Sequence, residues 1–148
     1  MVLSVRPRHV LDILNGSKTV ELRRVRPQIQ PGQPVAVYGT IPMAAVVATC
    51  RVSKVDIACP SRIKERYLSA AAISSAEFDA YFEGASTAVA IHLSAITTLD
   101  HVVTLQQLRF RQRSYNPPQS WHFFDHLKLH ELLGGHASHH ELSKMLAE

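Results

Sequence analysis

The chain has 148 residues, of which 46% are hydrophobic and 19% are charged, the balance of an ordinary globular domain. This length fits one domain with a substantial core, and two cysteines do not make a disulfide framework, so we expect a cytoplasmic protein. No apolar run approaches the ~20 residues that cross a bilayer, and the N-terminus lacks the apolar segment of a secretory signal. We therefore expect no membrane partner.

The positive charge is concentrated near the N-terminus. The formal net charge is +4, and the stretch through residue 26 holds six basic side chains against Asp12 and Glu21, so the remainder of the chain is balanced. A local basic surface attracts phosphate and other anions. The basic side chains of this stretch are Arg6, Arg8, Lys18, Arg23, Arg24 and Arg26.

The first segment predicts a strand, a helix and a second strand. Residues 2–4 read as a strand, Pro7 suits the first turn of a helix, and Gly16 is placed to end that helix in a left-handed conformation. Residues 19–24 follow as a strand. Its alternation sets Val20 and Leu22 on one face and puts Glu21 and Arg23 together on the other, which we expect to point away from the core.

The middle of the chain predicts a hairpin and two helices. Residues 35–38 and 44–55 read as strands of an antiparallel hairpin, with Cys50 a small buried thiol. Residues 61–72 look helical. Ser74 and Glu77 fit a capping box that opens a short helix ending at Phe82.

The last third predicts a long strand and several helices. Residues 87–99 alternate as a strand, residues 105–108 form a helical turn, and Arg109, Arg111 and Arg113 follow. Residues 116–121 form a rigid loop, and residues 121–133 and 138–147 read as helices joined at Gly134-Gly135. Strands interrupted by short helices indicate an α+β fold, a small barrel of about five strands.

Three stretches resemble the ASCH domain, named for activating signal cointegrator homology. They are Leu3-Ser-Val-Arg-Pro-Arg8, Ile13-Leu-Asn-Gly-Ser-Lys-Thr-Val-Glu-Leu-Arg23 and Val35-Ala-Val-Tyr38. The similarity covers about residues 2–121, so we expect a domain over 1–121 with a helical C-terminal extension over 122–148 packed on it. The resemblance implies a PUA-like fold, a mixed or antiparallel β-pseudobarrel of five to six strands with short flanking helices. It also implies a role with RNA or modified bases.

We expect RNA or a modified nucleoside to bind in a basic cleft. Lys18 suits phosphate, Arg23 offers a planar fork, and Glu21 can accept from a base amine. The full predicted set is Arg6, Arg8, Lys18, Thr19, Glu21, Arg23, Tyr38, Gln119 and Ser120. The alternatives stay open: Glu21 and Arg23 also fit a plain cross-strand ion pair, and Tyr38 also fits a barrel wall.

A small hydrolase is the alternative function. Some ASCH members are amidohydrolases that act on an acylated cytidine, and the resemblance puts their lysine at Lys18. Glu21 stands where they have a threonine, and Ala71 or Ala72 where they have a glutamate. An amidohydrolase or ribonuclease acting on modified nucleosides or RNA would use Lys18 and Glu21 as an acid–base pair. We rank binding ahead of catalysis.

The C-terminal tail raises two further hypotheses. Its apolar residues suit packing on the barrel or, as a second alternative, a protein-interaction module. His126 and His130 have the i, i+4 spacing of zinc ligands, but no carboxylate or cysteine stands at companion spacing. We expect no metal and no cofactor.

Overall fold

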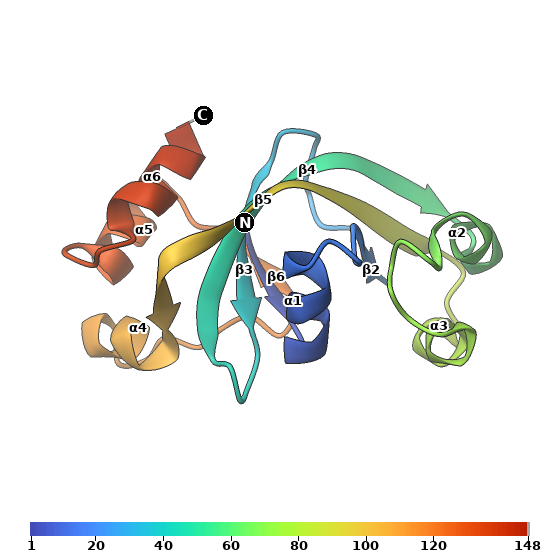
Figure 1. Cartoon of the computed structure of the whole chain (residues 1–148), viewed down its shortest axis with the longest axis horizontal. Helices are drawn as coiled ribbons and strands as arrows, with labels where there is room; N and C mark the ends of the chain where they lie inside the picture. The colour runs from blue at the N-terminus through green and yellow to red at the C-terminus, as the bar shows by residue number, and fades with distance from the viewer. Residues whose placement is uncertain (148) are drawn as a thin grey trace.

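A computed structural model describes residues 1–147, which form a curled six-stranded sheet flanked by helices (Figure 1). The elements in chain order are β1 (Val2–Val5), α1 (Pro7–Leu14), β2 (Val20–Arg23), β3 (Pro34–Gly39), β4 (Ala45–Ala58), α2 (Pro60–Tyr67), α3 (Ser75–Phe82), β5 (Ala88–Thr104), α4 (Leu105–Arg111), β6 (Trp121–His122), α5 (His126–Leu133) and α6 (His139–Ala147).

The sheet has the order β2-β5-β4-β3-β1-β6, so β2 and β6 are its two edges. β1 runs parallel to β3, and the other neighbours are antiparallel, including the predicted hairpin of β3 and β4. The long strands β4 and β5 arch from the end that carries α4, α5 and α6 to the end that carries α2 and α3 (Figure 1). The predicted α+β fold with five to six strands and flanking helices is confirmed, and its sheet is a curled half-barrel.

Local signals place the N-terminal elements. Pro7 opens α1, and Gly16 follows it with φ +83°, a left-handed conformation that glycine adopts without a steric penalty. Its backbone N–H donates to the Ile13 carbonyl. The predicted helix stop is therefore confirmed, and it turns the chain directly into Lys18 and β2.

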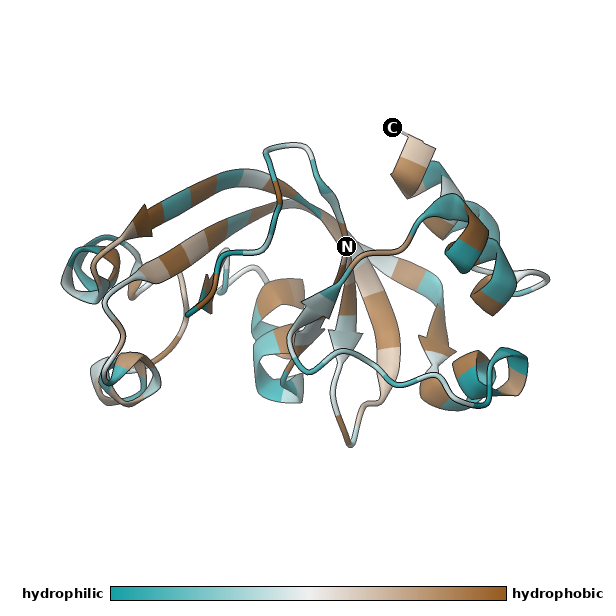
Figure 2. Cartoon of the chain, turned by 180° about the vertical axis from the view of Figure 1, so that it is seen from behind, coloured by the Kyte–Doolittle hydropathy of each residue, from teal (hydrophilic) through white to brown (hydrophobic). Residues whose placement is uncertain are grey.

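Alternation along β4 and β5 separates two packing faces, visible as hydropathy bands (Figure 2). On one face the buried residues of β1, β3, β4 and β5 form the barrel interior together with Val10 and Ile13 of α1. On the other face, α2 and α3 pack over Val20 and Leu22 at one end. α4, α5 and α6 cover the opposite end.

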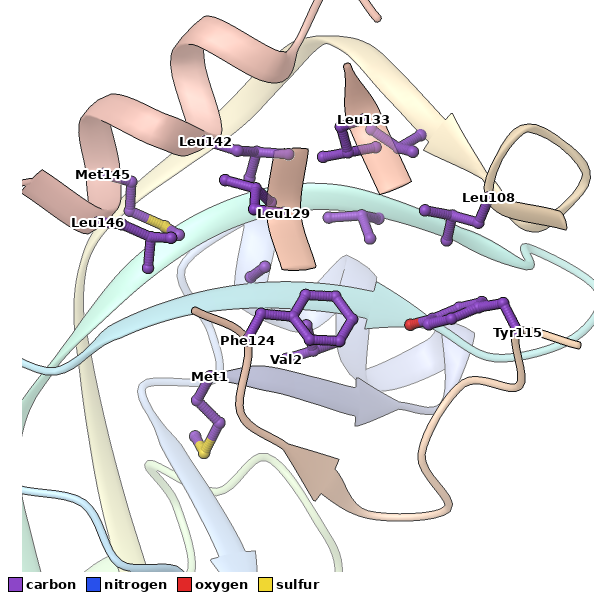
Figure 3. Close-up of a pocket in the computed structure, with 13 residues that line it drawn as sticks. Met1, Val2, Leu108, Tyr115, Phe124, Leu129, Leu133, Leu142, Met145 and Leu146 are labelled. Carbon is purple, nitrogen blue, oxygen red and sulfur yellow. The ribbon is translucent and has the colours of Figure 1, made fainter. Parts of the chain in front are cut away.

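The C-terminal helices pack on the sheet. Leu129, Leu132 and Leu142 share a buried cluster with Val2 and other residues of the sheet. The close-up shows leucines of α5 and α6 directed toward the strands, with the Phe124 ring beside Val2 (Figure 3). None of the helices in residues 1–147 has the length and apolar character needed to cross a membrane.

Several predicted boundaries are wrong. A single helix over residues 121–133 does not form, because Trp121 and His122 pair with β1 and the Asp125 carboxylate caps α5 by accepting from the Lys128 N–H at 2.7 Å. The helix predicted over residues 61–72 ends at Tyr67. β4 and β5 extend past their predicted ends, to Ala58 and Thr104. The capping box of Ser74 and Glu77 is confirmed.

Candidate functional site

The edge strand β2 is buried on both faces. Val20 and Leu22 pack beneath α2 and α3, while Glu21 and Arg23 lie opposite Ile91 and Val89 of β5 and so face the barrel interior. Our expectation that this polar face points away from the core is wrong. The two helices occupy the other face, so the polar face is turned inward.

Lys18, Glu21 and Arg23 form what we call the interior ion cluster. The Lys18 Nζ lies 3.2 Å from Glu21 Oε2, and an Arg23 guanidinium nitrogen lies 2.7 Å from Glu21 Oε1. The three residues are only 2%, 7% and 9% exposed. Glu21 therefore bridges two cations, and the cluster keeps an excess of one positive charge.

Arg23 ties the two sides of the sheet together. One guanidinium nitrogen donates to the Ser4 carbonyl of β1 at 2.8 Å, and the other donates to the Ser120 Oγ, just before β6, at 2.9 Å. The Ser4 N–H also donates to the Ser120 carbonyl. We call this junction, where β2 meets β1 and the start of β6, the seam.

Lys18 ties the cluster to the segment after α2. Its Nζ donates to the Ala71 carbonyl at 2.8 Å, and the Thr19 N–H donates to the Ala70 carbonyl at 2.9 Å. The backbone oxygen of Ala71 therefore meets Lys18 in the region where the resemblance places a glutamate. A carbonyl accepts hydrogen bonds, but it cannot exchange a proton.

The outer side of the seam carries exposed polar residues. Arg6, Thr19 and Gln119 are exposed, and Ser120 is half-buried. Arg8 is exposed too, and its guanidinium lies 2.6 Å from a carboxylate oxygen of Glu77. Of these predicted residues, Ser120 contacts the interior ion cluster through Arg23, Thr19 follows Lys18 in the chain, and Arg8 pairs with Glu77 of α3.

His9 is a neighbour of the cluster that the sequence analysis missed. Burial and the nearby Lys18 ammonium lower the pKa of His9 from its ordinary value. Its Nδ1 is buried, lies 3.8 Å from an Asp12 carboxylate oxygen, and has no hydrogen-bond partner in the part of the chain that is described. A single histidine on an amphipathic helix carries no motif, so only the fold reveals this position.

Tyr38 lies apart from the cluster. It packs on the opposite face of the sheet, with Val46, Leu108 and Tyr115. Burial raises the pKa of Tyr38, and the nearby Arg109 cation acts in the opposite direction. Consecutive strand residues face opposite sides of a sheet, so Tyr38 and its neighbour Val37 belong to different clusters.

The sequence of a curated relative aligns with most of this chain. It is an ASCH domain-containing ribonuclease of Zymomonas mobilis subsp. mobilis, 29% identical over 123 residues, which are 80% of each protein. The crystal structure of ASCH from Zymomonas mobilis superposes with a TM-score of 0.82 at 26% identity, over 90% of this chain and 92% of that one. In both sequence and fold, the chain is similar to this ASCH domain. No family model matches the sequence.

Further solved structures share this fold. A tyrosine-to-phenylalanine variant of the Zymomonas mobilis protein gives a TM-score of 0.82, over 90% of this chain and 95% of that one, at 26% identity. A protein of Enterococcus faecalis V583, 12% identical over 79% of this chain and 77% of that one, has a TM-score of 0.51. The second likeness concerns the fold alone.

The chain also carries a polar network that the sequence analysis did not identify. Asp56 accepts hydrogen bonds from Lys54 and Tyr67, which lower the pKa of Asp56, and the same carboxylate oxygen lies 3.5 Å from His92 Nε2. The Tyr67 and His92 rings meet edge to face at 4.7 Å. This network joins the end of α2 to β4 and β5.

Metal-binding groups do not converge in residues 1–147, where no set of three or more His, Cys, Asp and Glu side chains is placed to hold an ion. In the tail, the His130 and His139 rings are 5.3 Å apart. Two hollows stand out elsewhere. One is apolar, lies under α5 and α6 and contains about 470 Å³ including open space; the other lies along residues 26–33.

Proposed function

We propose that this protein binds RNA at the outer side of the seam. The supporting relative is the Zymomonas mobilis protein whose name calls it a ribonuclease. The observation that carries the proposal is the excess positive charge of the interior ion cluster, together with exposed Arg6 and Arg8 at the start of α1. A positive potential at a polar rim suits a phosphate backbone.

The residues take different roles in this proposal. Arg6 and Arg8 contact phosphates, Arg8 by exchanging its Glu77 carboxylate for the RNA. Thr19, Gln119 and Ser120 offer hydrogen-bonding groups at the rim. The interior ion cluster keeps these residues in position and supplies a positive electrostatic potential, which the negative charge of Glu21 weakens. The hydrogen-bonding groups of Thr19, Gln119 and Ser120 would give the site its specificity for a base or modified nucleoside.

Binding should depend on salt and on Arg6. Fluorescence anisotropy with a labelled single-stranded RNA should show affinity that falls as salt rises. One lost phosphate contact removes about 0.7 from the slope of log affinity against log salt for a single strand, so Arg6→Gln should lower the slope by about that amount.

The control is Arg62→Gln, an equal charge change at the exposed start of α2. It should leave the slope nearly unchanged. Equal slopes for the parent and Arg6→Gln, or no detectable RNA binding by the parent, would count against RNA binding at the seam.

A second candidate is RNA cleavage at the same place, which His9 favours. Lys18 and Glu21, the pair predicted from the sequence, lie 3.2 Å apart as an ion pair. Each is therefore occupied by the other rather than available to exchange a proton with RNA. Burial and the Lys18 cation lower the pKa of His9 beside them, which favours the neutral imidazole that a general base requires. We assign proton transfer to His9 and orientation to Lys18 and Glu21.

The chemistry would follow the intramolecular route open to RNA. The imidazole takes the proton of a 2′-hydroxyl, the 2′-oxygen attacks the adjacent phosphorus, and the 5′-oxygen leaves with a proton from water. The products then carry a 2′,3′-cyclic phosphate and a 5′-hydroxyl. The nearby cations would stabilise charge that develops on the phosphate.

Cleavage of a labelled RNA should therefore depend on His9 and on pH. Loss of a general base costs about 10²- to 10⁴-fold, so His9→Gln should slow cleavage by at least about 100-fold. Because the neutral imidazole is the active form, the rate should rise with pH and level off above the lowered pKa of His9. His126→Gln on α5 is the control. Undiminished cleavage by His9→Gln would remove His9 from the reaction.

A further inference from the structure

The helix α4 presents an aromatic ring to solvent. Phe110 is 87% exposed, although a buried aromatic side chain is a large source of stability. Its helix contributes Leu108 to the core and leaves Phe110 outside. The ring therefore adds little to the fold and is accessible to a partner.

Arginines surround this ring in the sequence. Arg109, Arg111 and Arg113 are all exposed, and residues 105–113 contain no aspartate or glutamate. Arg109 is held in place, because its Nε donates to the Tyr115 carbonyl at 3.1 Å and a terminal nitrogen donates to the Asn116 side chain at 3.2 Å. Arg111 lies against the Gly134-Gly135 turn. Phe110 thus stands on an exposed basic helix end, next in the chain to an anchored arginine.

Residues 112–120 connect this surface to the seam. The connection leaves α4, crosses the end of the sheet and reaches β6 (Figure 2). Arg109 binds its first part, and Ser120 at its far end accepts a hydrogen bond from Arg23 of the interior ion cluster. A chain-like ligand that lies along this connection would contact both places.

We propose that Phe110, with Arg109, Arg111 and Arg113, forms a stacking platform for single-stranded RNA that leads away from the seam. This inference rests on the proposed RNA function. Unpaired bases stack on aromatic rings while arginines hold the phosphates, whereas bases inside a duplex cannot reach a phenyl ring. The platform therefore selects single-stranded over double-stranded RNA without reading sequence.

The test compares Phe110→Ser with the parent on a single-stranded RNA and on a duplex of the same sequence. Stacking of one base on an aromatic side chain gives about a tenfold effect, so the variant should bind the single strand about ten times more weakly and the duplex equally well. Phe110→Trp should keep the affinity. The midpoint of thermal unfolding should not change, because the ring is exposed.

Leu127→Ser is the matched control, since Leu127 is 77% exposed on α5. It should leave both affinities unchanged. If the parent binds the single strand and Phe110→Ser binds it equally well, the platform is wrong while RNA binding at the seam stands. If Phe110→Ser weakened duplex binding as much as single-strand binding, the proposal that bases stack on Phe110 would be wrong. A dimer of the parent that dissociates in Phe110→Ser, seen by light scattering, would assign the ring to a second copy of the chain. If the parent binds no RNA, the proposed function itself fails.

Discussion

At the scale of single residues, Arg23 decides how the barrel closes. Its guanidinium contacts Glu21 in its own strand, the Ser4 carbonyl in β1 and the Ser120 hydroxyl before β6. Five donors in a planar fork can serve three partners at once, which a lysine ammonium cannot do with the same geometry. One side chain thereby links segments that are 97 residues apart.

Replacing Arg23 should destabilise the fold. Breaking a buried pair leaves a carboxylate without its partner, which costs about 3–5 kcal/mol. Because Lys18 still pairs with Glu21, we expect Arg23→Gln to lose an amount near the lower end of that range, about 3 kcal/mol, in urea denaturation. Arg23→Lys should lose less, because it keeps the charge.

Arg24 provides the control, because it is the adjacent residue and its guanidinium donates to the Tyr81 and Glu83 carbonyls at the surface. Arg24→Gln should change the free energy of unfolding by less than about 1 kcal/mol. If Arg23→Gln were as stable as Arg24→Gln, the seam would not depend on Arg23.

At the scale of elements, capping and turns were predictable because their interactions are local. The Glu77 N–H donates to the Ser74 Oγ at 3.1 Å, and the Glu77 carboxylate accepts from the Ser74 N–H at 2.8 Å. The two partners are only three residues apart in the chain, so a short sequence motif is enough to predict their contacts. The carboxylate also pairs with Arg8, and together these contacts lower the pKa of Glu77 to about 2.

The lengths of β4 and β5 were not predictable in the same way. The register between them shifts at three places, and Ala95 of β5 has φ +50°. Each irregularity interrupts the simple alternation, so the hydrophobic pattern fades before the strand ends. Pairing with the partner strand, rather than the pattern, carries both strands to their ends and bends the sheet.

At the scale of the whole molecule, three apolar clusters share one sheet. The barrel interior, the cluster beneath α2 and α3, and the cluster beneath α4, α5 and α6 all use strands of that sheet. Leu142 of α6 packs in the third cluster, with Met145 and Leu146 nearby (Figure 3). We propose that the extension over 122–148 unfolds together with the rest.

Leu142→Ala tests this proposal. Truncating a buried leucine costs about 2–5 kcal/mol, and Leu142 is 2% exposed. Urea unfolding followed by Trp121 fluorescence and by far-UV circular dichroism should shift by the same amount, because Trp121 packs against the barrel interior. Leu127→Ala, at an exposed site on α5, should change little. A helical signal lost before the tryptophan signal would show that the tail unfolds alone.

The sequence by itself determined the local devices of this protein. The helix stop at Gly16, the capping box of Ser74, the alternation in β2 and the order of elements through α4 all depend on residues close together in the chain. From these and the ASCH resemblance, the fold class followed.

Only the tertiary structure decided which face of each strand lies inside. Alternation groups Glu21 with Arg23, but the packing of α2 and α3 on the opposite face turns the pair inward. The same geometry separates Tyr38 from the cluster and brings His9 to it. Such outcomes depend on contacts between distant segments, and a pattern of period two is identical whichever face is buried.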